Sequence, residues 1–390
     1  NQTRRYITKM ECSDGGTYIL FSAPRFLYAG RARAYLIKRC IPFEERSVGH
    51  SSFTEIKPIG KLPTIPTLVT PNGEVIRDGA AIIDHFESTF GRLFRPISPL
   101  QDMVSSLFDV IGSEGLRRPA MHYRWNFPED NDDFLYYHFF SLFRPDYPDR
   151  EQKTISVMEM LRTTTKMRGV TGDTKELVEG LYIELLDALN SHFQHTPYLL
   201  GGSPCIGDFG MLAPLYGHLA RDPYPAALMK KLAPRVYRRV ERMNRESQDA
   251  PEYFDFDTDF LQKNEIPETL IAVLRVLSQD FVPETVASAK FLNLWLSEQN
   301  PETGSPAVFQ LGTSPLGNVE FQVRDHTINA AIVPYRHFQL QRIHQIFDEV
   351  ETKTQIQIKK ILKSCDMADI LNVRLNRSIG RKDNLEVWLD

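Results

Sequence analysis

The sequence predicts an α/β domain near the start of the chain, an all-helical domain after it, and an appended α+β region. Residues 17–95 combine short β-prone runs, a hairpin signal and two helical stretches. Strand signals stop after the Pro-rich linker at residues 95–99 and return only beyond residue 318. The chain also has 390 residues, which is too long for one ordinary domain. We therefore predict an arm over 1–16, followed by domains over 17–95, 96–250 and 251–390.

The first domain opens with a strand, a helix and a second strand. The strand is Tyr18 to Phe21, and residues 30–39 then show helical spacing, with apolar side chains predicted inward and Arg31, Arg33 and Lys38 outward. Residues 41–45 begin the second strand. A strand–helix–strand unit followed by a hairpin and a helix is the thioredoxin-like order, which this chain completes by about residue 94.

The hairpin and its flanks form the stretch from residue 60 to residue 87. Two β-prone runs, 67–69 and 75–76, flank Pro71-Asn72-Gly73, a strong turn signal, and Asp78 stands where a helix N-cap belongs. Pro66 cannot donate to a strand ladder, so it belongs at a strand start, where a cis bond after Ile65 is favoured. The Ile65 backbone would then face outward beside a positive helix end, which suits a peptide carboxylate.

These residues resemble the glutathione-binding half of the glutathione transferase superfamily. In that family an X-Pro backbone pairs with the cysteinyl part of glutathione, and an acidic-Ser pair holds the γ-glutamyl end. The resemblance implies these roles for Ile65 and Pro66, and for Asp78 with Gly79, which replaces the usual Ser or Thr. Loss of one hydrogen bond to a charged group costs about 1.5–3 kcal/mol, which would weaken binding without excluding it. The competing interpretation is a thioredoxin-like fold that binds no ligand.

The loop from Ser22 to Tyr28 is where a catalytic hydroxyl or thiol would lie, because such strand-to-helix loops carry chemistry. Phe-Ser-Ala-Pro, with Arg33 eleven residues after the serine, is similar to transferases whose serine favours the glutathione thiolate. Related bacterial transferases place a serine where this chain has Phe26, and other subfamilies place a cysteine there. Ser22 and Tyr28 are therefore the catalytic candidates, although Ser22 also fits a turn ahead of proline.

The predicted helical domain includes helices over 101–114 and 174–194. Met121, Tyr123 and Trp125 lie between them and form either core or, by the resemblance, an apolar acceptor pocket. Cys205 and Asp208 match the capping element of the superfamily's buried helix, with cysteine in place of the hydroxyl. A later helix carries arginines on one side, for which we expect a solvated face rather than a phosphate-binding one: Arg235, Arg238, Arg239 and Arg242.

The region over 251–390 resembles the tail of a long bacterial-type subfamily through Pro334-Tyr335 and Leu340-Gln341-Arg342. We expect helices over 267–277, 285–296, 335–350 and 354–363. Residues 319–323 alternate like a half-exposed strand, which we expect to pair with residues 385–389. Specific motifs for the superfamily cover roughly residues 17–245.

Composition excludes several classes of function. The net charge of −4 argues against a nucleic-acid partner, and no apolar run approaches the roughly 20 residues of a membrane span. The four cysteines have no CxxC pair, and no histidine pair has further ligands, so we expect neither a disulfide framework nor a metal. This fits the cytoplasm or another reducing compartment, including a mitochondrion after removal of a transit peptide.

Two functions follow from the sequence. The first is a glutathione transferase that uses glutathione as co-substrate and transfers its thiol to an apolar electrophile. The second is a non-catalytic transferase-like scaffold, or an accessory subunit of a larger protein assembly. Phe26 and Gly79 favour the second, because both lack side chains that the reaction or the ligand would use. Two forms of assembly stay open from the sequence, a homodimer or incorporation into a larger complex through residues 251–390.

Overall fold

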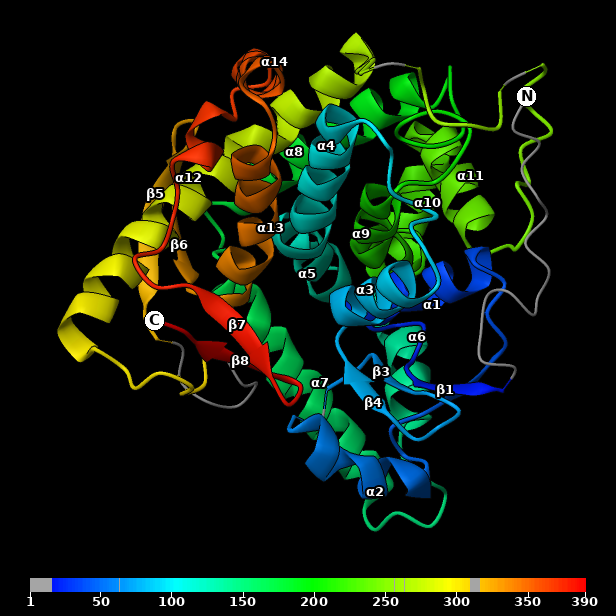
Figure 1. The fold of residues 1–390 in the computed structure, drawn as a ribbon. Coiled ribbons are helices and arrows are strands. Elements are labelled where there is room, and N and C mark those ends of the chain that lie inside the picture. The colour runs from blue at the N-terminus through cyan, green and yellow to red at the C-terminus, as the bar shows by residue number, and fades with distance from the viewer. Residues whose placement is uncertain (1–15, 63, 256, 263, 309–315) are drawn as a thin grey trace.

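The computed structural model describes residues 16–62, 64–255, 257–262, 264–308 and 316–390. Its first domain contains a four-stranded sheet with strand order β2-β1-β3-β4, which Figure 1 shows in blue. β1 pairs in parallel with β2 and antiparallel with β3, which pairs antiparallel with β4. The bounds of these strands are β1 Tyr18–Phe21, β2 Phe43–Arg46, β3 Thr67–Val69 and β4 Val75–Arg77.

Three helices complete this domain, and they confirm the thioredoxin-like order predicted from the sequence. Asp78 is the N-cap of the third helix, since its carboxylate accepts a hydrogen bond from the Ala80 N–H at 3.3 Å. Residues 51–60, for which no helix was predicted, form the second. The helices are α1 Leu27–Lys38, α2 Ser51–Gly60 and α3 Gly79–Thr89.

The second part of the chain is helical and is organised around α9, which is buried along its whole length. Asp208 accepts from the Cys205 backbone N–H at 2.9 Å, as the capping motif predicted, and also pairs with Arg239 at 2.8 Å. The elements are α4 Pro99–Val110, η1 Ile111–Gly115, α5 Arg117–Trp125, α6 Pro128–Phe140, α7 Arg150–Met167, α8 Lys175–His192, α9 Ile206–Pro214, η2 Leu215–Leu219, α10 Pro223–Leu232 and α11 Pro234–Met243.

The C-terminal region differs from the prediction in two respects. One continuous helix, α12 Glu268–Gln299, replaces the two expected helices and contains Pro283. The predicted pairing of 319–323 with 385–389 is wrong, because each segment pairs with its own near neighbour in an antiparallel hairpin. The elements are β5 Asn318–Val323, β6 His326–Ala331, α13 Tyr335–Glu349, α14 Thr352–Ser364, η3 Ala368–Leu371, β7 Ile379–Lys382 and β8 Leu385–Trp388.

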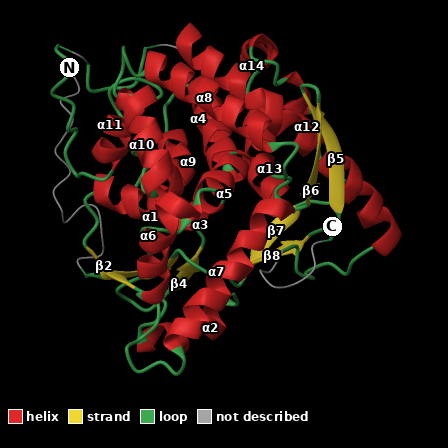
Figure 2. Ribbon diagram, turned by 180° about the vertical axis from the view of Figure 1, so that it is seen from behind, coloured by secondary structure: helices red, strands yellow, loops and turns green. Residues whose placement is uncertain are grey.

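This C-terminal region is packed onto the rest of the molecule. Helix α12 lies along α8, and α13 packs against α4 (Figures 1 and 2). The β7–β8 hairpin, red in Figure 1, reaches the β4 edge of the first sheet. The largest hydrophobic core cluster accordingly includes side chains from all three predicted domains. No described helix combines the length and apolar character needed to cross a membrane.

Several basic side chains predicted to face solvent are buried instead. Arg31 pairs with Asp109, and Lys38 donates to the Tyr198 hydroxyl at 3.1 Å. The expected solvated face on α11 is wrong for two of its arginines, because Arg239 and Arg242 are fully buried. These two cations have buried acceptors on neighbouring segments, including Asp208 for Arg239 and the Pro197 carbonyl for Arg242.

Candidate functional site

The residues predicted to bind glutathione form one corner at the start of α3. The Ile65–Pro66 peptide bond is cis, and the Asp78 N–H donates to the Pro66 carbonyl at 3.0 Å. A Cβ atom on Gly79 would lie 3.7 Å from Pro66 Cγ and 3.4 Å from the Tyr28 carbonyl oxygen. No hydrogen bond to another described residue occupies the Ile65 N–H or carbonyl. The structure therefore brings Ile65, Pro66, Asp78 and Gly79 together beside the first turn of α1.

Side chains of the C-terminal region bind the Asp78 carboxylate of this corner. The Tyr335 hydroxyl lies 2.8 Å from both oxygens of Asp78, and Arg381 Nη2 lies 2.7 Å from Oδ2. Burial alone would raise the pKa of Asp78, but Arg381, then Arg31 and Arg77, outweigh it and hold this pKa far below its ordinary value. Asp78 thus has a mostly buried carboxylate, 9% exposed, that is already neutralised and hydrogen-bonded within the chain.

The β7–β8 hairpin also covers the adjacent edge of the sheet. The Asn384 side chain accepts from the Arg77 N–H at 3.0 Å and donates to the Val75 carbonyl at 2.8 Å. These are the bonds that a neighbouring strand would make to β4. Arg77 also pairs with Glu386 at 2.5 Å, and both side chains are buried. The tip of the hairpin therefore closes the β4 edge and the Asp78 corner together.

Ser22 lies at the end of β1 and faces the β2 side of the sheet. Its hydroxyl donates to Glu45 Oε1 at 2.6 Å, and Glu45 also pairs with Arg33 at 3.0 Å. β2 and β4 are the two opposite edges of the sheet. Among the described residues, no hydrogen bond joins the Ser22 hydroxyl to the corner at Asp78, so the two predicted parts of the site have separate partners.

Tyr28 lies in the first turn of α1, and its hydroxyl points toward η1. It donates to Glu114 Oε1 at 3.1 Å, and Arg117 Nη1 lies 3.5 Å from its oxygen. Burial, then the nearby Glu114 carboxylate, raises the pKa of Tyr28 to about 12. The hydroxyl is therefore protonated near neutral pH and already has an anionic acceptor.

The predicted acceptor pocket divides between two hydrophobic clusters. Tyr123 belongs to the main core, where its ring stacks on Phe127 at 5.5 Å between centroids. Trp125 and Met121 belong to a smaller cluster that also contains Phe26. The structure thus joins Phe26 to Met121 and Trp125 and places Tyr123 elsewhere. None of the four lines the polar groove described below.

The sequence did not predict which residues from distant parts of the chain contact this corner. Arg31 approaches Gly79 and pairs with Asp109, while Tyr335 and Arg381 come from segments more than 250 residues further along the chain. The available signal was the Asp383-Asn384 pair, a hairpin turn type in which both residues have positive φ. It indicates a turn at this position but does not indicate what the turn contacts.

Comparison with known families assigns the first domain. Residues 20–93 match the family model described as glutathione S-transferase, N-terminal domain. This span runs from β1 past the end of α3 and includes Ile65, Pro66, Asp78 and Gly79. The first domain is therefore a glutathione S-transferase N-terminal domain, with a helical region and an α+β region after it. A comparison with curated proteins finds no match.

Solved structures similar to this chain include several transferases of the same superfamily. The β-etherase LigF from Sphingobium sp. strain SYK-6 is 16% identical, with 60% of this chain and 97% of that chain covered and a TM-score of 0.42. A glutathione S-transferase from Methylobacterium radiotolerans, in complex with glutathione sulfonate, is 16% identical over 64% and 97% of the two chains, with a TM-score of 0.38. At these values the matches carry no argument about function, and the family assignment rests on residues 20–93.

Proposed function

We propose that this chain is a non-catalytic glutathione transferase-like protein whose ligand corner is occupied by its own C-terminal region. The observation that carries this proposal is the pair of contacts that Tyr335 and Arg381 make with Asp78. An incoming γ-glutamyl ammonium group would have to displace a hydroxyl and a guanidinium group from a buried carboxylate. Since a hydrogen bond to a charged group contributes about 1.5–3 kcal/mol, this displacement opposes glutathione binding strongly.

The two candidate catalytic hydroxyls support the same proposal. A serine hydroxyl has one proton, and that of Ser22 is directed to Glu45, so it cannot also stabilise a thiolate. The Tyr28 proton is directed to Glu114. Phe26, which stands where relatives place a serine or a cysteine, contributes only apolar surface to its cluster. The catalytic roles of Ser22 and Tyr28 stay predictions, as does the acceptor pocket.

A second candidate is an active transferase, and one observation favours it. The Ile65 peptide groups have no hydrogen-bond partner among the described residues, beside a helix N-terminus. They could pair with the cysteinyl part of glutathione once the C-terminal region moves aside. An apolar electrophile, incorporation into a larger assembly and self-pairing of the chain stay predictions under both candidates.

Calorimetry with glutathione distinguishes the two candidates. We expect no heat of binding and no thermal shift with millimolar glutathione for the unmodified chain. The double variant Tyr335→Phe/Arg381→Met frees Asp78 and should gain measurable binding. Lys382→Met, a change on the same hairpin at an exposed residue that makes no contact with Asp78, should behave like the unmodified chain.

Turnover is the second readout. The proposal predicts that the unmodified chain does not conjugate glutathione to a generic aromatic halide. Binding together with turnover in the unmodified chain, and a loss of at least about tenfold in Ser22→Ala, would establish the enzyme and contradict the proposal.

A further inference from the structure

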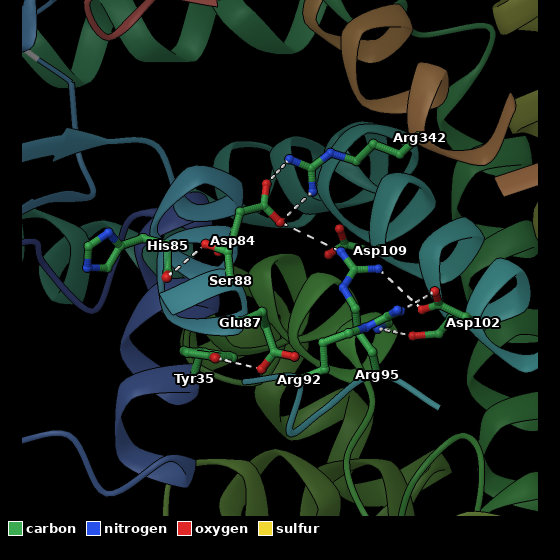
Figure 3. A network of polar contacts seen from close by, with 12 residues as sticks. Tyr35, Asp84, His85, Glu87, Ser88, Arg92, Arg95, Asp102, Asp109 and Arg342 are labelled. Atoms are coloured by element: carbon green, nitrogen blue, oxygen red, sulfur yellow. Dashed lines mark hydrogen bonds and ion pairs between the residues drawn. The ribbon is translucent and has the colours of Figure 1, made fainter. Parts of the chain in front are cut away.

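A polar groove of about 520 Å³ lies where the three parts of the chain meet. Its walls come from α3, the segment after α3, the first turn of α4 and the side of α13 (Figure 3). Apart from Ile346, the lining residues carry polar or charged groups, and they include Asp84, Arg92, Arg95, Asp102, Arg342 and Glu349. It contains none of the residues of the Asp78 corner.

The charged side chains form an alternating row across the groove. Arg342 pairs with Asp84, which lies 3.6 Å from Arg95, and Asp102 is shared by Arg95 at 3.2 Å and Arg92 at 2.8 Å. Figure 3 shows these contacts as dashed lines running from Arg342 to Arg92. Three guanidinium groups therefore share two carboxylates.

The other carboxylates near the row do not neutralise the excess of guanidinium groups over carboxylates within it. Glu87 pairs with Arg39 at 3.0 Å, and Asp109 pairs with Arg31, so each has a cation of its own. Glu349, the last residue of α13, is exposed and accepts from Gln345 Nε2 at 2.8 Å. Glu349 has no cationic partner within the described ranges, so the positive surplus lies with the row and this acid lies at the end of α13.

The groove also has more free donors than free acceptors. The Arg92 side chain is 61% exposed and uses only Nη2, leaving Nε and Nη1 without a partner among the described residues. The Nε atoms of Arg95 and Arg342 donate no hydrogen bond to a described residue. Both oxygens of Asp102 already accept, one from each neighbouring arginine. A ligand that pairs with the free N–H donors of this groove must therefore supply acceptor oxygens.

We propose that this groove binds a small molecule carrying an oxyanion, either a carboxylate or a phosphate. Arg92 presents a free guanidinium edge that can bind two oxygens side by side, and Arg95 and then Arg342 follow it along the row. Arg95 is held in place from two sides by Asp102 and Asp84, so the second cation of the site is positioned before the ligand arrives. A bound oxyanion would connect α13 to α3 and α4, and so stabilise the docked C-terminal region.

Inorganic phosphate and succinate test the proposal on the full chain. Thermal shift and calorimetry should show saturable binding of one or both, and the comparison identifies which oxyanion the groove prefers. Arg92→Gln should weaken binding at least about tenfold. Arg92→Lys keeps the charge but loses the bidentate guanidinium geometry, so its affinity should lie between those of the unmodified chain and Arg92→Gln. The matched control is Arg144→Gln, because Arg144 is an exposed arginine that pairs with Asp146 and does not line the groove.

Two results would overturn the proposal. One is the absence of saturable binding for both anions in the unmodified chain. The other is equal binding by Arg92→Gln and Arg144→Gln, which would assign the anion to another basic surface. Neither result depends on glutathione, because the groove and the Asp78 corner share no residue. The proposal can therefore fail while the proposed function stands, and the converse also holds.

Discussion

The Tyr335 hydroxyl lies 2.8 Å from both carboxylate oxygens of Asp78, although 257 residues separate the two in the chain. Asp78 caps α3 and belongs to the first domain, whereas Tyr335 begins α13. The contact therefore places a side chain of the C-terminal region at the position that the superfamily resemblance reserves for a ligand.

Removing the contacts at Asp78 should destabilise the chain unequally. Tyr335→Phe loses one hydrogen bond to a charged group and should lower the free energy of unfolding by about 1.5–3 kcal/mol. Arg381→Met leaves Asp78 and Glu386 short of a cation and should cost about 3–5 kcal/mol. Urea unfolding measures both, and Lys382→Met should stay within about 0.5 kcal/mol of the unmodified chain. Equal, negligible effects for all three variants would show that the contact with Asp78 does not hold the C-terminal region in place.

Gly79→Ser should be tolerated but should not create glutathione binding. The new Cβ would lie 3.4 Å from Arg31 Cδ and from the Tyr28 carbonyl oxygen, which is ordinary van der Waals contact. We expect a change in stability below about 1 kcal/mol. Calorimetry should still detect no glutathione, because Tyr335 and Arg381 still occupy Asp78. Binding gained by this single change would mean that the absent hydroxyl, rather than the docked C-terminal region, was the obstacle.

Substitution of Glu284 should lower the free energy of unfolding more than most single substitutions in the chain. It is buried on α12 and pairs with Arg118 and Arg336, each at 2.9 Å, so Glu284→Gln leaves two buried cations with less negative charge. We expect a loss of about 3–5 kcal/mol. Glu184→Gln, which breaks an exposed pair with Arg324, should cost less than about 1 kcal/mol. Similar losses for the two variants in urea unfolding would contradict this ranking.

The same carboxylate predicts a dependence of stability on acidic pH. Burial would raise the pKa of Glu284, but Arg336 and then Arg118 outweigh it and lower this pKa from 4.5 to about 2. A depressed carboxyl pKa contributes stability that is fully present above pH 4.5 and is lost as the pH falls toward 2. The unfolding free energy of Glu284→Gln should therefore change less than that of the unmodified chain across this window.

Lys38 should make the stability of the protein depend on pH in the alkaline range. Burial, then the nearby Arg242 cation, lowers the pKa of Lys38 from 10.5 to about 7. The unfolded chain binds this proton more tightly than the folded chain does, so stability should rise between pH 7 and pH 10.5, by about 1.4 kcal/mol per pKa unit at most. Lys38→Met should lack this rise. Parallel stability curves for the two proteins between pH 7 and pH 10.5 would rule out the shift.

The first domain could be predicted because its signals are local. The turn at Pro71-Asn72-Gly73, the cap at Asp78 and the proline at a strand start each depend on a few neighbouring residues. The cap at Asp208 was found for the same reason. Periodicity likewise located α4, α8, α13 and α14 to within a few residues.

The buried ion pairs, the pairing of the C-terminal strands and the contacts at Asp78 could not be predicted, because they depend on residues that are distant in the sequence. Helical spacing placed Arg31 and Arg239 among polar positions, but it could not show that Asp109 and Asp208 would meet them inside the protein. The predicted strand pairing is wrong because a turn at Arg324-Asp325 joins β5 directly to β6. Nothing local to Tyr335 or Arg381 indicates that either reaches Asp78.

The closure of the β4 edge by Asn384 has a consequence for synthesis. During translation the first sheet emerges long before residue 384, so its outer strand has unpaired peptide groups throughout elongation. Maturation of this domain is therefore expected to finish only after residue 384 has left the ribosome. Nascent chains that stall before that point would display an open sheet border, a surface that favours association with other chains or capture by chaperones.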